Sequence, residues 1–150
     1  MQDFAIHHNI TFWSALIAWF VAQSVKMTAH FVASKKIDFR YLVSTGGMPS
    51  AHSAMVSSLM TSVAFTSGMS SPLFAVTVAF AGVVMFDAQS VRRAAGLQAS
   101  LLNQILDELF RDHHLSQKKL KELLGHTRVE VGFGMLVGIL VGLIIHWNFG

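Results

Sequence analysis

His126 and Glu130 are the first pair of side chains in this sequence that could do chemistry together. They are four residues apart, which puts them on one face of a helix. A carboxylate at that spacing can hold one ring N–H of the histidine, fix its tautomer and leave the other nitrogen free to attack or to accept a proton. The alternative is a purely structural helix start, where an acidic residue is favoured by the helix dipole and Thr127 could equally be the cap.

A second group of residues surrounds the sequence Pro49-Ser50-Ala51-His52. Pro49 suits the first turn of a helix, where its missing N–H would be unpaired anyway. The free N–H groups of that turn form an anion site, to which Ser50 adds a hydroxyl and His52 a proton donor. Lys36 and Arg40 lie just upstream. His52 alone would be interpreted as a packed polar residue, but with His126 it can supply the general acid of a phosphoryl transfer whose nucleophile is His126.

Three further basic residues are candidates for phosphate binding, and one acidic residue could support them. One guanidinium of Arg92 and Arg93 can clamp a phosphate with two hydrogen bonds, while Asp87 holds an arginine or binds a metal. The alternative for this set is membrane anchoring plus an ion pair. Lys26 lies inside an apolar stretch, where a lysine is a functional candidate by default, although it could instead snorkel to the headgroups.

The composition indicates a membrane protein. The chain has 150 residues, which we expect to form one domain, 1–150; 53% are hydrophobic and 13% are charged. Soluble domains carry roughly 25% charged residues. The sequence lacks cysteine, which excludes disulfides and thiolate chemistry. It also lacks a Gly-x-Ser-x-Gly elbow, a Walker loop and a dinucleotide fingerprint, and we expect neither a cofactor nor a nucleic-acid partner.

The hydropathy pattern predicts an all-α membrane bundle with about four transmembrane helices, because each span needs about 20 mainly apolar residues. The expected spans are residues 10–29, 49–66, 72–88 and 129–147. Residues 97–114 have the spacing of an amphipathic helix that lies on the membrane or against the bundle, and residues 115–124 form a basic surface segment. Gly134, Gly138 and Gly142 form a close-packing face, within the bundle or in a homodimer.

The distribution of basic residues gives one clear orientation for these spans. With both termini outside, all 11 Lys and Arg residues fall on the inner side or near its interface. The same threading places His52, Asp87, His126 and Glu130 on that inner face. This convergence predicts a phosphate site at the cytoplasmic face of the membrane, or at the equivalent face in an organelle.

Three blocks of sequence resemble the divergent PAP2 family, which is related to type 2 phosphatidic acid phosphatases and vanadium haloperoxidases. The blocks are residues 44–53 (STGGMPSAHS), 86–96 (FDAQSVRRAAG) and 122–130 (ELLGHTRVE), and the resemblance covers nearly the whole chain. It implies a PAP2-like bundle in a bacterial inner membrane or a plastid membrane. It departs from the broader superfamily in having Ala51 for the usual glycine and Glu130 for the usual aspartate.

The resemblance implies that His126 is the nucleophile that takes the phosphoryl group, that Glu130 orients it and that His52 is the general acid. Arg40, with Lys26 or Lys36, would stand for the first motif of the superfamily, and Arg92 or Arg93 could substitute for the arginine of the third. The expected function is hydrolysis of a lipid phosphate or diphosphate. Two alternatives are a non-enzymatic protein that binds anionic headgroups or a partner, and a small transporter with Lys26 and Asp87 in its pathway.

Overall fold

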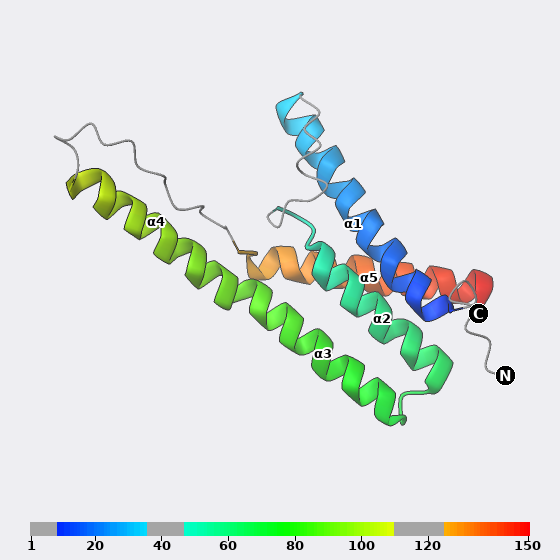
Figure 1. Ribbon diagram of the computed structural model, residues 1–150. Coiled ribbons are helices and arrows are strands. Elements are labelled where there is room, and N and C mark those ends of the chain that lie inside the picture. The colour runs from blue at the N-terminus through cyan, green and yellow to red at the C-terminus, as the bar shows by residue number, and fades with distance from the viewer. Residues whose placement is uncertain (1–8, 36–46, 110–124) are drawn as a thin grey trace.

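The computed structural model describes residues 9–35, 47–109 and 125–150, and every regular element within them is an α-helix. The helices are α1 (Ile10–Ser34), α2 (Ala51–Ser67), α3 (Pro72–Gln89), α4 (Val91–Leu109) and α5 (Arg128–Phe149). The expected all-α class is therefore confirmed. Figure 1 shows α2 between α1 and α3, with α5 behind it and α4 continuing α3 away from the bundle.

Three segments are long and apolar enough to cross a membrane: Ile10–Val32, Pro72–Glu108 and Arg128–Phe149. The exact number of four spans is not confirmed, because α2 has only 17 residues, many of them serine and threonine. The first helix also runs to Ser34, five residues beyond the predicted end of its span.

The bundle is held together by small residues and hydroxyl groups. The residues that are wholly buried are mostly alanine and serine, including Ala18, Ala22 and Ala54. The hydroxyls of Ser14 in α1 and Ser58 in α2 lie 2.7 Å apart, and Ser62 donates to Thr11 at 3.1 Å. In a membrane, where lipid competes for apolar contacts, close backbone approach and interhelical hydrogen bonds are what hold helices together.

The glycine face of α5 packs against α2 within this chain. A Cβ atom added at Gly138 would lie 2.9 Å from the carbonyl carbon of Ala54, and one at Gly142 would lie 2.9 Å from Cβ of Thr61. Both distances are too short for a real Cβ atom, so only glycine permits this helix spacing. The face is therefore used inside the bundle, and it gives no support to a homodimer.

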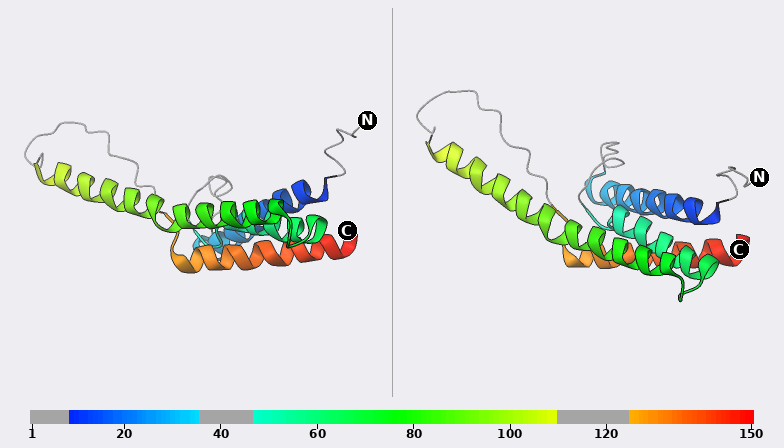
Figure 2. Two further views of the ribbon diagram at one scale, coloured as in Figure 1. Left: turned by 90° about the horizontal axis from the view of Figure 1, so that it is seen from below. Right: turned by 60° about the horizontal axis from the view of Figure 1, so that its bottom comes forward.

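The amphipathic helix differs from the prediction in where it begins. It was expected from residue 97, but α4 starts at Val91, directly after Ser90, which ends α3. Ser90 keeps the right-handed helical conformation, so the chain continues in almost the same direction. Among the described elements α4 contacts only α3, and Figure 2 shows it projecting from the bundle in two further views. The predicted end of this helix at residue 114 and the basic segment 115–124 lie outside the described residues.

Candidate functional site at one end of the bundle

The short segment before α5 places His126 against the end of α3. The backbone N–H of His126 donates to the carbonyl oxygen of Ala88 at 3.0 Å. The residue is only 3% exposed. Its ring nitrogen Nδ1 lies 3.1 Å from Oε2 of Glu130. A carboxylate can only accept, so in the neutral ring this contact places the proton on Nδ1 and leaves Nε2 with its lone pair.

Glu130 has two roles in this geometry: it contacts the histidine ring, and it belongs to the start of the helix. Both interpretations of its position in the sequence therefore apply. The same oxygen Oε2 accepts the backbone N–H of Thr127 at 2.9 Å, while the Thr127 hydroxyl accepts the N–H of Glu130 at 3.3 Å. These two bonds form the capping box that begins α5. The helix start therefore fixes the carboxylate that contacts the histidine ring.

Gly125 lets the backbone of this segment approach the junction of α3 and α4. A Cβ atom added there would overlap the backbone of Arg93, with Cα of that residue 2.6 Å away. Gly125 was not among the residues predicted from the sequence. Its position directly before a histidine and a helix cap is the signal that could have found it.

Burial lowers the pKa of the His126 ring below its ordinary value of 6.5. The contact with Glu130 works in the opposite direction, and the positive charges of Lys26 and Arg92 add to the lowering. The neutral imidazole is therefore favoured, which is the form that can attack an electrophile.

Charged side chains of α1, α3 and α4 lie within electrostatic range of His126 or His52. His52, near the start of α2, interacts with Arg92, His126, Lys26 and Asp87. Lys26 of α1 is buried, and the aliphatic part of its side chain lies against Gly47. A Cβ atom added at Gly47 would be 3.6 Å from both Cγ and Cδ of Lys26. The structure thus gathers side chains that are as many as 104 positions apart, from Lys26 to Glu130.

Asp87 holds an arginine, one of the two roles expected for it. Nε of Arg92 donates to Oδ2 of Asp87 at 2.7 Å, across the junction between α3 and α4. Both side chains are substantially exposed, so the pair orients the guanidinium more than it stabilises the fold. Within the described parts of the chain, no three His, Cys, Asp or Glu side chains form a group that could hold a metal.

Ser50 is the N-cap of α2, and the proline lies one residue before it rather than in the first turn. The Ser50 hydroxyl accepts the N–H of Ser53 at 3.4 Å and its own N–H donates to the carbonyl of Glu130 at 3.1 Å. This role is structural, and a phosphate contact by Ser50 stays a prediction. The Arg93 side chain is exposed. Lys36 and Arg40 lie outside the described residues.

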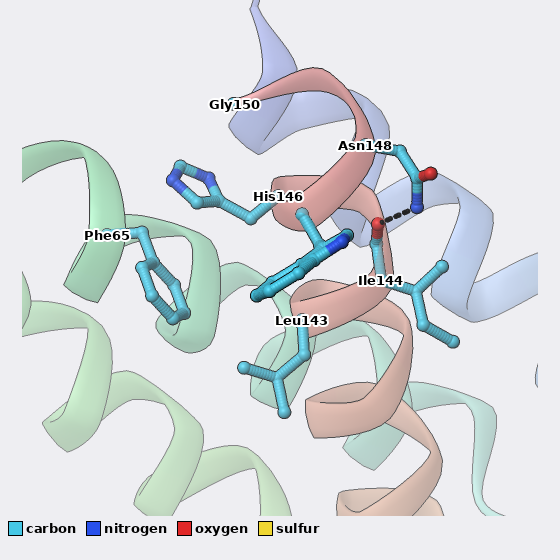
Figure 3. A pocket seen from close by; sticks show the side chains of 7 residues that line it. Phe65, Leu143, Ile144, His146, Asn148 and Gly150 are labelled. Atoms are coloured by element: carbon cyan, nitrogen blue, oxygen red, sulfur yellow. Dashed lines mark hydrogen bonds between the residues drawn. The ribbon is translucent and has the colours of Figure 1, made fainter.

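A pocket at the other end of α5 is separate from this cluster. Figure 3 shows its lining, which consists of Phe65, Leu143, Ile144, His146, Trp147, Asn148 and Gly150. The ring of His146 stacks on Phe65 with centroids 4.5 Å apart, and Asn148 donates to the carbonyl of its own helix at Ile144. α5 begins beside His126 and is about 33 Å long, so this pocket lies far from the charged groups.

The fold and the composition define an integral membrane protein built from α-helices. A family model described as the divergent PAP2 family matches residues 7–141, and the chain therefore belongs to that family. A protein of Bacillus subtilis (strain 168), described as the uncharacterized membrane protein YuiD, is 44% identical over 152 residues, which cover 94% of this chain and 96% of that protein. No solved structure matches.

Proposed function

We propose that the protein is a lipid phosphatase that hydrolyses a phosphomonoester or diphosphate of a lipid through a phosphohistidine intermediate. One observation carries the proposal: a buried histidine, His126, has one ring nitrogen held by Glu130 and lies within electrostatic range of the cations Lys26 and Arg92. This arrangement gives a neutral nucleophile in surroundings that favour an anionic substrate.

In the first step Nε2 of His126 attacks phosphorus, and a P–N bond forms as the bond to the leaving oxygen breaks. His52 donates a proton to that oxygen, and the lipid leaves as an alcohol, or as a lipid monophosphate if the substrate was a diphosphate. In the second step water attacks the phosphohistidine, His52 takes a proton from the water, and the P–N bond breaks to release inorganic phosphate.

The remaining residues position the phosphate. Lys26 and Arg92 offset its charge, and Asp87 orients the guanidinium of Arg92. We propose that Lys36, Arg40, Ser50 and Arg93 complete the phosphate site. Catalysis of this kind consists mainly of positioning and charge stabilisation.

The proposed location of the site is the cytoplasmic face of a bacterial inner membrane. The helix start at Ile10 and the helix end at Phe149 lie at the opposite end of the bundle from His126, as the bond between Thr11 and Ser62 and the packing of Gly142 on Thr61 indicate. The basic residues of the described helices, from Lys26 to Arg128, are near the His126 end, which the positive-inside rule assigns to the cytoplasm.

The test is phosphate release by the detergent-purified protein from phosphatidic acid, phosphatidylglycerol phosphate and a polyprenyl diphosphate. We expect release by the wild type, its loss in His126→Ala, and its retention both in EDTA and in His146→Ala. The second histidine lies at the far end of the same helix and serves as the matched control. Loss of release in EDTA would instead make Asp87 a metal ligand.

Folded protein that releases phosphate from none of these lipids would contradict the proposal. Binding of the same protein to anionic vesicles would then support the alternative, a membrane protein that binds headgroups without turnover.

A further inference from the structure

One strip of α2 is left uncovered between two neighbouring helices. α2 contacts α1, α3 and α5, whereas among the described residues α1 and α3 do not contact one another. Figure 1 shows α1 and α3 on either side of α2, with α5 behind it. The side of α2 that faces away from α5 therefore lies between α1 and α3.

Four residues define this strip, namely His52, Met55, Leu59 and Thr66. Their separations of three, four and seven residues put them on one face of the helix. Each is exposed or partly exposed, and Met55 is 39% exposed. Buried residues border the strip on both sides. Val56 and Val63 lie on one side, and Ser58 and Ser62, which bond to α1, lie on the other.

The strip begins at the candidate functional site. His52 is exposed, whereas His126 and Lys26 are each 3% exposed. Both Lys26 of α1 and Arg92, just beyond α3, lie within electrostatic range of His52. The inner end of the strip therefore lies near two positive charges, one from α1 and one from the start of α4.

The remainder of the strip has the chemistry and the depth of a hydrocarbon contact. Met55 and Leu59 lie about 4.5 and 10.5 Å along the helix from His52, given a rise of 1.5 Å per residue. One leaflet of the bilayer contributes about 15 Å of hydrocarbon. Methionine adapts its shape to irregular apolar ligands. A lipid with its phosphate beside His52 would thus have its chain beside Met55 and Leu59.

We propose that this strip holds one hydrocarbon chain of the lipid whose phosphate binds at His126, so that the substrate enters sideways from the bilayer between α1 and α3. The inference rests on the proposed function for the identity of the phosphate site. It adds a contact to that function: a phosphate on a long hydrocarbon chain is also bound through its chain, whereas a short-chain phosphate is bound at the phosphate alone.

The first test uses the absence of cysteine from the sequence. A single cysteine is introduced as Leu59→Cys, or as Leu136→Cys on the exposed face of α5 for a control at similar depth. The His126→Ala change is added to prevent turnover. The rate of labelling by N-ethylmaleimide is then measured with long-chain phosphatidic acid, and with phosphatidylcholine of the same chains.

We expect phosphatidic acid at ten times its Kd to slow labelling at position 59 about tenfold, because about a tenth of the sites stay free. Labelling at position 136 should not change, and phosphatidylcholine should protect neither position. Equal labelling of position 59 with both lipids would overturn the proposal. Because labelling needs no turnover, protection without phosphate release by the wild type would overturn the phosphatase alone.

The second test separates the chain from the phosphate. Leu59→Trp should lower phosphate release from long-chain phosphatidic acid about tenfold, since a larger side chain occupies the space of the chain. Release from the dihexanoyl lipid should be unchanged, and Leu136→Trp should affect neither. The wild type could release phosphate while Leu59→Trp loses release equally on both substrates. That result would overturn the proposed role of the strip and leave the proposed phosphatase activity in place.

Discussion

Glu130 reaches His126 from within the capping box that begins α5, with Oε2 of the carboxylate 3.1 Å from Nδ1 of the ring. The helix start and the histidine thus share one carboxylate. The carboxylate that closes the capping box of α5 also holds the imidazole in one orientation and one tautomer.

This sharing separates the effects of two substitutions. Glu130→Gln removes the charge beside the ring, and we expect phosphate release to fall about 10- to 100-fold, as a hydrogen bond to a charged group contributes about 1.5–3 kcal/mol. Thr127→Ala removes the cap but keeps the carboxylate, and it should cost about 1 kcal/mol of stability with little loss of release. Initial rates and thermal unfolding of both variants check this. Equal rates in the two variants would contradict the orienting role of Glu130.

Gly125 should act on the site rather than on the whole fold. In Gly125→Ala the added Cβ overlaps the backbone of Arg93, so the segment must move and His126 loses its bond to Ala88. We expect release to fall about tenfold or more, since a small misplacement of a reacting group is costly. Gly82→Ala, which meets no atom within 4 Å, is the control. Release at the wild-type rate in Gly125→Ala would show that this approach does not position the histidine.

The glycine face of α5 should determine the stability of the bundle. Gly138→Ala places a Cβ against the backbone of Ala54, and overpacking of this kind costs about 1–3 kcal/mol. Gly132→Ala, in the same helix with nothing within 4 Å, should leave the melting temperature in detergent unchanged or raise it. A melting temperature of Gly138→Ala equal to that of Gly132→Ala would mean that α2 and α5 separate at no cost.

The lowered pKa of His126 predicts how acid affects stability. The unfolded chain binds a proton at this residue near pH 6.5, whereas the folded chain binds it only at lower pH. The contribution of His126 to the free energy of unfolding is therefore complete above pH 6.5 and is lost as the pH falls from 6.5 toward the pKa in the folded state.

Thermal unfolding at pH 7.5 and 5.5 measures this effect as the difference between the wild type and His126→Gln, which cancels most of the contribution of the other histidines. The wild type should lose more stability on acidification. The rate of phosphate release by the folded protein should fall at lower pH, as the pH reaches the lowered pKa of His126, because the protonated ring has no free lone pair. A larger loss of stability in the variant would reverse the sign and refute the prediction.

The sequence alone was sufficient for the all-α membrane class, the family and the pairing of His126 with Glu130. These depend on local pattern: apolar runs of the right length, three sequence blocks in a fixed order, and a separation of four residues on one helix face. The end of α1 and the start of α4 were misplaced, because nothing in the local pattern marks where a helix that leaves the membrane must stop or bend.

Only the tertiary structure brought Lys26, His52 and Arg92 within range of His126, because the interactions join helices whose relative rotation local pattern does not specify. It also decided that Glu130 both caps and orients, since the two roles use the same spacing and differ only in where the carboxylate points. The approach of Gly125 to Arg93, the use of the glycine face inside the chain and the open strip of α2 all follow from which helices are neighbours. Which helices are neighbours is determined by side-chain packing between them, and this packing depends on several segments at once.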